Sequence, residues 1–327
     1  MAPLTTKQHC EEFSFKLFLI INMSKNNQKK LTGFRKGMKK HGMSIAFAAP
    51  FLTLFFVFTV IPVFIAIVLS FTRYDIVRPA QFVGLQNYLA LFLEDSIFLT
   101  AFKNTMLFAV MYAPLSMLVT MGGAWLINDY TPRVRTVLTF IFYAPNLTGG
   151  MMAIWALLLS GDSYGILNQA LMSLGIITTP IQWLTDTQYF FTILMVVSLW
   201  SCLGSGFLTF VAAFRGIDPA LYEAAAMDGI KNRVQELWYI TLPTLKPQLL
   251  YQALGSITGG FSVGALSATL FGNPSPQYAA HTIVLHMQDY IGTRMEYGTG
   301  CAIAVILFAL QVGGNKLLSK FIRRVGS

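Results

Sequence analysis

Long apolar segments separated by shorter polar connections make up most of this chain. A transmembrane helix needs about 20 mostly apolar residues to cross a hydrocarbon layer of roughly 30 Å. Six segments meet that length, with ends defined to within several residues. They are residues 44–71, 104–128, 136–160, 189–214, 247–271 and 297–319. The pattern predicts an all-α polytopic membrane protein with six transmembrane helices.

The composition agrees with a chain that faces lipid rather than water. Of the 327 residues, 55% are hydrophobic and only 11% are charged, whereas a soluble domain carries roughly 25% charged residues. The formal net charge is +9. In so apolar a chain it does not indicate nucleic-acid binding, because basic residues of membrane proteins gather in cytoplasmic loops.

The sequence lacks the motifs of metal, disulfide and nucleotide chemistry. Its three cysteines, Cys10, Cys202 and Cys301, are too scattered for a disulfide framework or a metal site. Its four histidines form no pair at the spacing of metal ligands on a helix, and no Gly-x4-Gly-Lys-Ser/Thr loop occurs. We therefore expect no metal on this chain and no ATP bound through such a loop.

Lysine and arginine are distributed asymmetrically between the two sets of connections. The tail before residue 44, the second-third and fourth-fifth connections and the C-terminal end hold 19 of the 23 basic residues. Because such residues mark the cytoplasmic side, both termini and the fourth-fifth connection are predicted to be cytoplasmic. Residues 1–43 form a predicted basic cytoplasmic tail before the six-span domain, 44–327. Met23 opens the Lys-rich part of this tail and is a hypothetical alternative start.

The interiors of the six segments contain no Asp, Glu, Arg or His, and Lys occurs only at an end. Carriers driven by protons or ions usually need ionisable groups within the membrane. This feature argues against an ion-coupled carrier, although backbone carbonyls alone can hold Na⁺. A membrane enzyme is disfavoured as well, since neither a nucleophile-base pair nor an intramembrane Glu/His set stands out.

The fourth-fifth connection has the signals of two short helices joined by a sharp turn. Asp218 is a favourable N-cap, and Pro219 suits the first helical position. The next eight residues are mostly strong helix formers, and Gly229 can stop the helix in a left-handed conformation. A second helix is predicted at about 232–241, ending before Pro243.

Four short motifs then make the sequence recognisable. They are Glu223-Ala224-Ala225 with Gly229 and Ile240-Thr241-Leu242-Pro243, residues 82–88 (FVGLQNY), residues 164–168 (YGILN) and residues 260–263 (GFSV). In their order along the chain, the motifs resemble the EAA motif and other segments of ABC importer permeases. Residues 217–229 resemble the carbohydrate branch, the maltose and glycerol-phosphate type. The similarity covers nearly everything from Ser44 onward.

The resemblance implies a type I ABC importer permease fold in the bacterial cytoplasmic membrane. Such a permease forms a dimer with a second permease, here expected to be a heterodimer embedded in membrane lipids. The dimer works with two ATPase subunits and with an extracytoplasmic substrate-binding protein. ATP and Mg²⁺ are then bound by the ATPase subunits, so this chain is expected to carry no cofactor and no catalytic residue. The loop 215–246 is expected to hold the coupling helix. Its expected ATPase contacts are Glu223, Ala224, Ala225, Asp228 and Gly229.

The same resemblance places the substrate between the two permeases near mid-membrane. Sugar sites combine aromatic faces with hydroxyl or amide groups. The candidates of this kind are Asn146, Ser198, Trp200, Ser201, Ser205, Thr258, Phe261 and Ser262. The amides and the tyrosine of the maltose-type pocket are replaced here by Ser, Thr or Gly, so maltose-like contacts are not carried over.

Each of these candidates also has a structural alternative. Ser and Thr in membrane helices often bond their own backbone or a neighbouring helix, and Trp200 equally suits packing. Glycines with small-xxx-small spacing are predicted to let helices approach closely. They are Gly255, Gly259, Gly260 and Gly264.

The predicted function is that of the permease subunit of an ATP-driven importer for a sugar or oligosaccharide. An ABC permease for a non-sugar solute is the first alternative, and an ion-coupled carrier or channel is the second. The first outer connection, about 72–103, is long enough to dock a separate binding protein.

Overall fold

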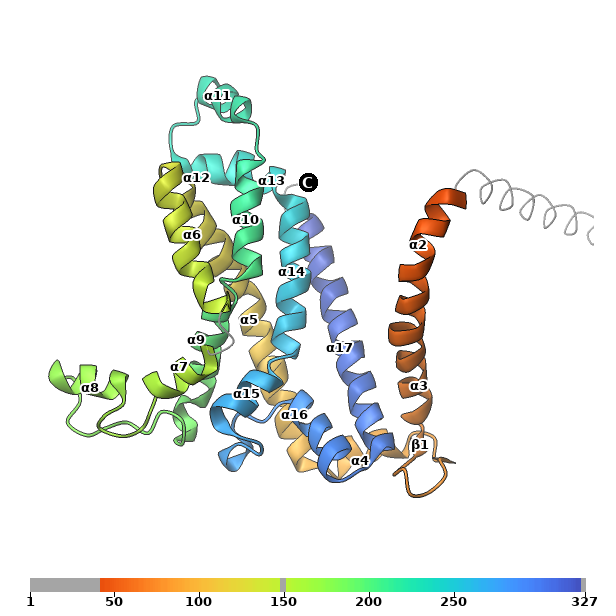
Figure 1. The fold of residues 1–327 in the computed structure, drawn as a ribbon. Helices are drawn as coiled ribbons and strands as arrows, with labels where there is room; N and C mark the ends of the chain where they lie inside the picture. The colour runs from red at the N-terminus through yellow and green to blue at the C-terminus, as the bar shows by residue number, and fades with distance from the viewer. Residues whose placement is uncertain (1–41, 148–150, 325–327) are drawn as a thin grey trace, which may run out of the picture. The chain divides into compact units, whose positions relative to one another are not determined.

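The computed structural model describes residues 42–147 and 151–324 (Figure 1). The predicted N-terminal tail, including Met23, therefore lies almost wholly outside the described residues. The chain divides into two units, residues 1–65 and 66–327, and each is described by itself.

The described residues are helical almost throughout. In chain order the helices are α2 (Gly42–Phe55), the π-helix η1 (Phe56–Val60), α3 (Ile61–Leu69), α4 (Gln86–Leu93), α5 (Ser96–Asn128), α6 (Pro132–Leu147), α7 (Met151–Leu158), α8 (Ile166–Ser173), α9 (Thr187–Ser201), α10 (Ser205–Arg215), α11 (Pro219–Met227), α12 (Arg233–Glu236), the π-helix η2 (Leu237–Thr241), α13 (Leu242–Thr244), α14 (Lys246–Phe261), α15 (Gly264–Phe271), the 3₁₀-helix η3 (Pro276–Tyr278), α16 (Ile283–Gln288), the π-helix η4 (Asp289–Thr293) and α17 (Tyr297–Arg324). The strands β1 (Thr72–Arg73) and β2 (Gln81–Phe82) pair antiparallel, with Thr72 opposite Phe82.

Among the described residues, three continuous helices are long and apolar enough to cross a membrane. They are Ala46–Leu69, Ser96–Asn128 and Tyr297–Lys320. The pairs α9–α10 and α14–α15 also qualify, each as one span bent by 43° and 44° respectively. Up to five of the six predicted spans are thus found. The third predicted span, 136–160, covers α6 and α7 and includes residues 148–150, which lie outside the described residues.

The fourth and fifth predicted spans are broken rather than continuous, which corrects the prediction. The first break spans residues 202–204, where Gly204 is the N-cap of α10. The second break spans residues 262–263, between α14 and α15. Ser and Gly lie within or beside both breaks, and such residues weaken the preference for an unbroken helix.

The sequence predicts that the second helix of the fourth-fifth connection ends before Pro243. This prediction is wrong, because the helix continues past that residue. Pro243 has no N–H to donate, which normally disrupts an α-helix. Here the preceding residues widen into the π-helix η2, in which the Leu242 N–H bonds to the Leu237 carbonyl. The chain then stays helical to Thr244. The π-helix η1 likewise lies just before a proline, Pro62.

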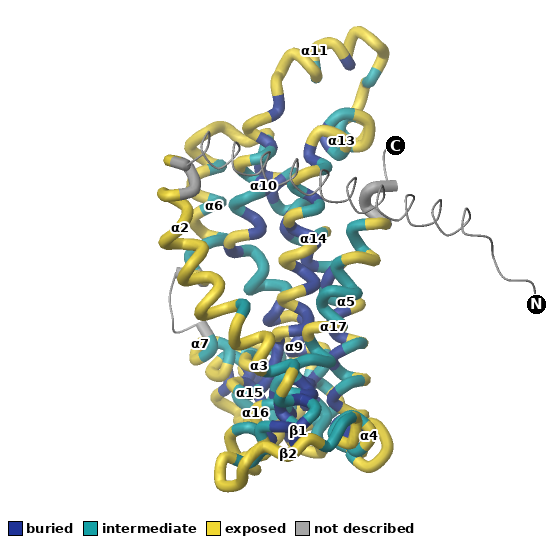
Figure 2. Tube along the Cα trace, turned by 90° about the vertical axis from the view of Figure 1, so that its right-hand side faces the viewer, coloured by how far each residue is buried: buried dark blue, intermediate teal, exposed yellow. Residues whose placement is uncertain are grey.

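The helices of residues 66–327 run between two ends. One end carries α11 and α12 and the end of α17, and we call it the α11 end (Figure 1). The other carries β1, α4 and α16, and we call it the β1 end. Figures 1 and 2 both place α11 at one end and β1 at the other. The tube view also shows α11 as almost wholly exposed (Figure 2). The loop 215–246 and the described C-terminal residues therefore share one end.

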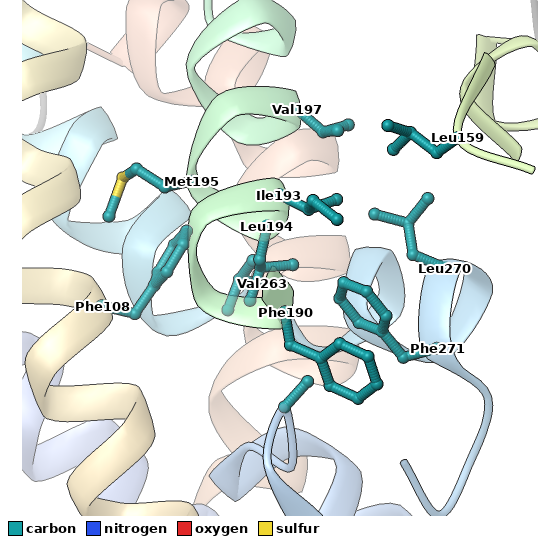
Figure 3. Packing of buried hydrophobic residues seen from close by; sticks show 11 residues of the cluster. Phe108, Leu159, Phe190, Ile193, Leu194, Met195, Val197, Val263, Leu270 and Phe271 are labelled. Carbon is teal, nitrogen blue, oxygen red and sulfur yellow. The ribbon is translucent and has the colours of Figure 1, made fainter. Parts of the chain in front are cut away.

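Helix α5 is the central packing element of residues 66–327. It contacts α4, α6, α9, α10, α14 and α16. One apolar cluster joins α5 to α9 and α15, with the rings of Phe190 and Phe271 stacked 4.2 Å apart (Figure 3). Against α14, a Cβ added at Gly260 would lie 3.0 Å from the Ala109 Cα, which explains the glycine there.

The predicted packing role holds for part of the glycine series. A Cβ at Gly264 would lie 2.7 Å from the Cβ of Val284, so only glycine fits without a shift. At Gly255, by contrast, an added Cβ meets nothing within 4 Å. The close approach of α14 and α15 to their neighbours thus depends on Gly260 and Gly264.

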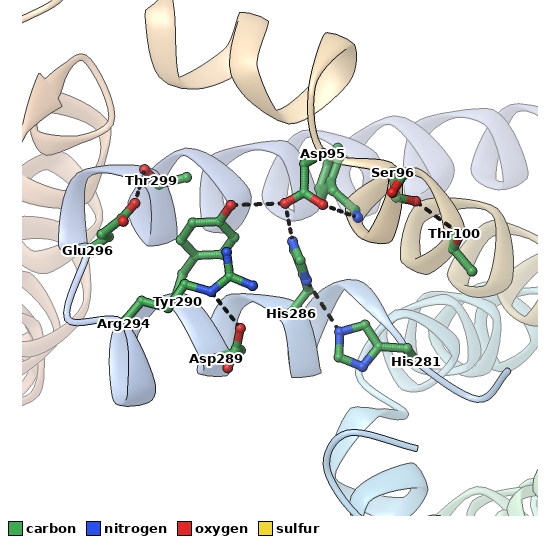
Figure 4. Close-up of polar contacts among 11 residues, drawn as sticks. Asp95, Ser96, Thr100, His281, His286, Asp289, Tyr290, Arg294, Glu296 and Thr299 are labelled. Carbon is green, nitrogen blue, oxygen red and sulfur yellow. Dashed lines mark hydrogen bonds and ion pairs between the residues drawn. The ribbon is translucent and has the colours of Figure 1, made fainter. Parts of the chain in front are cut away.

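A buried polar chain holds the start of α5 at the β1 end (Figure 4). Asp95 caps α5 by accepting the Phe98 N–H at 2.9 Å. Its other oxygen accepts from the Tyr290 hydroxyl and from His286 Nε2, each at 2.9 Å. His286 Nδ1 lies 3.3 Å from His281 Nε2, and the tautomers of the two rings decide which of them donates. His281 Nδ1 is buried and has no partner among the described residues.

The hydrogen bonds and burial of this polar cluster shift the pKa values of its two end residues, Asp95 and His281. Burial opposes ionisation of Asp95, but the bonds from Phe98, Tyr290 and His286 outweigh it and hold the pKa of Asp95 below its usual value. Burial, helped by the nearby His286, lowers the pKa of His281 to about 4. A proton on His281 Nδ1 would be a buried donor with no acceptor, so the two observations agree.

We predict that acid destabilises the β1 end in a defined window. The unfolded chain binds a proton on His281 near pH 6.5, whereas the folded chain does so only near pH 4. Between these values the unfolded state holds more protons, so stability falls as pH falls, by up to about 1.4 kcal/mol per pH unit. Thermal unfolding of the detergent-solubilised protein between pH 7.5 and 4.5 measures this slope.

His281→Asn serves as the matched variant because it removes the titrating ring. Its unfolding temperature should be lower at pH 7.5 but should change less between pH 6.5 and 4.5. An equal slope in both proteins would show that another group carries the acid sensitivity.

Candidate functional site

Helix α11 is capped at both of its ends. The Asp218 side chain accepts the Ala220 N–H at 3.0 Å, and Pro219 occupies the first turn, as predicted. At the other end Gly229 has a φ of +93°, and the Ile230 N–H bonds to the Ala225 carbonyl at 3.0 Å. This arrangement is a Schellman motif. The sequence signals of the helix therefore coincide with its observed ends.

The predicted coupling residues divide between two faces of α11. Glu223, Ala224, Asp228 and Gly229 are exposed. Ala225 is buried instead, with 8% of its surface exposed. Gly229 is required for its backbone conformation rather than for space, since an added Cβ meets nothing within 4 Å. Four of the predicted residues are thus exposed, whereas Ala225 is buried.

A hydrogen-bonded pair joins α11 to the π-helix η2. The Tyr222 hydroxyl lies 3.0 Å from Thr241 Oγ1, which in turn donates to the Glu236 carbonyl at 3.3 Å. Because the threonine proton is engaged there, Tyr222 is the donor to Thr241. Tyr222 also packs on an apolar cluster with Ile217 and Leu245. The helix is therefore attached to the rest of the loop on one side only.

Asn146 lies at the break between α9 and α10. Its amide nitrogen donates to the Ser201 carbonyl at 3.1 Å, and its oxygen accepts from the Gly204 N–H at 3.3 Å, when the two amide atoms are placed to suit these partners. A Cβ at Gly204 would come within 2.8 Å of Asn146 Cγ, so glycine makes room for the amide. Asn146 thus stabilises an interrupted helix, a role that its sequence context did not reveal.

The hydroxyl candidates fall into three classes. Ser201 and Thr258 bond their own helices, at the carbonyls of Val197 and Leu254. Ser198 is buried, and its hydroxyl has no partner among the described residues. Two more, Ser205 and Ser262, are exposed and flank the two helix breaks.

The aromatic candidates are packing residues in this chain. Phe261 is 5% exposed and lies in an apolar cluster with Ala109 and Ile257. Trp200 is half-buried and meets Trp155 edge to face, with ring centroids 4.9 Å apart. The indole N–H of Trp155 is buried and has no partner among the described residues. The structure therefore brings Trp200 beside an unpaired donor, and places Phe261 in the core.

Two asparagines of the recognised motifs organise the connections at the β1 end. Asn87 Nδ2 donates to the carbonyls of Ser70 and Thr72, at 2.8 and 2.9 Å. Asn168 is fully buried, and its oxygen accepts the Trp183 indole N–H at 2.8 Å. These asparagines hold the connections together, since Asn87 Nδ2 and both polar atoms of Asn168 already have backbone or side-chain partners.

Sequence comparison decides the family. Residues 120–324 match the family described as the binding-protein-dependent transport system inner membrane component. The chain belongs to this family. The match covers the loop 215–246 and both broken helices, so the candidate residues from Asn146 onward lie inside the region that defines these transport components.

Two of the relatives are named as sugar-transport permeases. The chain is 30% identical over 272 residues to the arabinooligosaccharides transport system permease protein AraP of Bacillus subtilis, covering 81% of this chain and 84% of the relative. It is 29% identical over 219 residues to the lactose transport system permease protein LacF of Rhizobium radiobacter, covering 65% and 70%. These similarities support the recognised resemblance to carbohydrate importer permeases.

A solved transporter shares the fold. A bacterial ABC transporter involved in the import of the acidic polysaccharide alginate superposes with a TM-score of 0.75 and 23% identity, over 89% of this chain and 99% of that one. The predicted all-α type I permease fold is confirmed by this likeness, and the chain is a multi-pass membrane protein.

We predict that Asn146→Leu weakens the permease at its helix break. The change removes both bonds to the break, at about 1 kcal/mol each, and should lower the thermal unfolding temperature and the solute uptake of reconstituted protein. Thr139→Val, on the same helix α6, is the matched control, since that hydroxyl bonds only its own helix. Equal stability and uptake of Asn146→Leu and the wild type would exclude a role for the amide at the break.

Proposed function

We propose that this permease moves a sugar or oligosaccharide across the cytoplasmic membrane as the translocating subunit of an ATP-driven importer. Family membership supports the transport role, and the named sugar permeases at 30% and 29% identity support the substrate class. The observation that carries the proposal is the exposed, capped helix α11, which offers Glu223, Ala224, Asp228 and Gly229 to a partner.

The partners follow from the same helix. The α11 end faces the cytoplasm in this proposal, because most basic residues outside the tail lie in its connections. An ATPase subunit receives α11 there and holds ATP and Mg²⁺, while the permease itself carries no cofactor and performs no covalent chemistry. A second permease completes the pathway in the membrane, and an extracytoplasmic binding protein delivers the substrate at the β1 end.

Transport then proceeds by alternating access. Closure of two ATPase subunits on ATP moves the coupling helices, and the pathway between the permeases changes from inward-facing to outward-facing. Exposed Ser205 and Ser262 at the helix breaks, with unpaired Ser198, are the groups of this chain best placed to meet a polyhydroxyl solute. In other transporters, backbone groups freed at breaks in membrane helices bind the substrate or a coupling ion.

We predict that Gly229→Asp uncouples ATP hydrolysis from uptake. A negative side chain on the exposed turn opposes the seating of α11 in the ATPase, and uptake per ATP hydrolysed should fall by about tenfold or more. Gly229→Asn is the matched control, because Asn has the same shape, no charge and tolerates the left-handed conformation. The measurement is uptake and ATP hydrolysis in proteoliposomes, with insertion checked by detergent chromatography.

Glu223→Ala should lower the same ratio by removing an exposed carboxylate that pairs with a basic partner group. Normal uptake per ATP in both Gly229→Asp and Glu223→Ala, at normal expression, would argue strongly against α11 as the coupling element.

Purification from the native membrane in mild detergent tests the assembly. We expect a second permease and an ATPase subunit to co-purify with the chain, and the cognate binding protein to bind a sugar. A non-sugar ligand on that binding protein would favour the other kind of ABC permease. Recovery of the chain alone, active in liposomes without ATP, would favour a carrier or channel.

A further inference from the structure

The end of α5 nearest to α11 is capped by two arginines from outside the helix. The last carbonyls of a helix have no partner within it. Arg233 Nη2 donates to the Trp125 carbonyl at 2.9 Å, and Arg135 Nη1 donates to the Asn128 carbonyl at 3.0 Å. Positive side chains at this end also oppose the partial negative charge of the helix dipole. Of the two, only Arg233 belongs to the loop that carries α11.

Arg233 makes two further contacts with the same helix end. Its Nε pairs with the Asp129 carboxylate, the residue that follows α5. Its guanidinium carbon lies 4.7 Å from the centre of the Trp125 ring, as in a cation–π pair. One side chain thus joins the start of α12 to the backbone, the ring and the charge at the end of α5.

This bridge has a geometry suited to positioning. The side chains of Arg233 and Asp129 are 38% and 55% exposed, and exposed ion pairs add little to stability. The planar guanidinium nevertheless fixes direction, because its donors are held in a rigid fork. A cavity of about 180 Å³, lined by Trp125, Tyr222 and Arg233 among others, separates the loop from the helix ends here.

Each partner of the bridge connects to an element that the proposed function uses. On one side, Arg233 begins α12, and η2 after it holds α11 through Thr241. On the other side, α5 packs directly on α9, α10 and α14, whose breaks carry the candidate substrate residues. A displacement of the loop therefore has a direct route to the helices around the pathway.

We propose that Arg233 is a positioning residue that transmits the displacement of the coupling loop to α5. The proposal rests on the function proposed above, since it needs α11 to be the element that an ATPase moves. It predicts that loss of the bridge leaves the ATPase attached and active while less of its motion reaches the pathway.

The test compares three variants in the reconstituted importer. Arg233→Ala removes all three contacts, and Arg233→Lys keeps the charge near Asp129 but loses the planar fork. Lys231→Ala is the matched control, since Lys231 is an exposed basic residue of the same loop. The readouts are uptake per ATP hydrolysed, ATPase co-purification and unfolding temperature.

We expect uptake per ATP to fall about fivefold or more in Arg233→Ala, in line with ordinary coupling free energies, with unchanged co-purification and unfolding temperature. Arg233→Lys should lie between Arg233→Ala and the wild type, and Lys231→Ala should match the wild type. A wild-type ratio in Arg233→Ala, or an equal fall in Lys231→Ala, would overturn the proposal.

Two further outcomes are separable. If Arg233→Ala does not assemble, Arg233→Lys decides: a reduced ratio in an assembled complex supports the proposal, and a wild-type ratio overturns it. If the wild-type chain shows no ATP-driven uptake and no ATPase partner, the proposed function fails, and this result does not depend on Arg233.

Discussion

A hydrocarbon layer contains no water that can bond a free backbone N–H or carbonyl, and this constraint governs how the chain can be interrupted. Two of its spans are broken, at residues 202–204 and 262–263. At the first break, Asn146 from another helix supplies an amide donor and an amide acceptor, and Gly204 leaves the space for it. A break of this kind remains stable because a neighbouring side chain replaces part of the lost helical bonding.

The range of the stabilising contacts, local or distant in sequence, explains which parts of the fold were predictable. The ends of α11 follow from local signals, an Asp218 cap and a Gly229 turn, so the sequence located them closely. The first break is stabilised by Asn146, which is far from residue 204 in sequence, so hydrophobicity alone predicted a continuous span there. The helix across Pro243 was missed because a π-helix can absorb a proline, and no local residue pattern marks this.

The candidate site shows the same division. The exposed residues of α11 were predicted because the motif and the helix lie in one short segment. The hydroxyl and aromatic candidates were chosen by residue type, and only their contacts separate exposed Ser205 and Ser262 from buried Phe261. Arg233 was not singled out, since its contact with Trp125 joins positions 108 residues apart. A basic residue in a loop gives no sequence signal of such a partner.

These contacts give α5 a particular place in the molecule. At the β1 end its first turn is fixed by Asp95, which is held by His286 and Tyr290 from the segment before α17. At the α11 end its last carbonyls are held by Arg233 and Arg135. Between them lie 33 residues of helix, and a packed helix moves largely as a body because interiors compress little. A helix whose two ends are held by polar side chains, including His286, Tyr290 and Arg233 from distant segments, can carry a displacement from one face of a membrane protein to the other, whereas a helix held only by apolar contacts can slip against its neighbours.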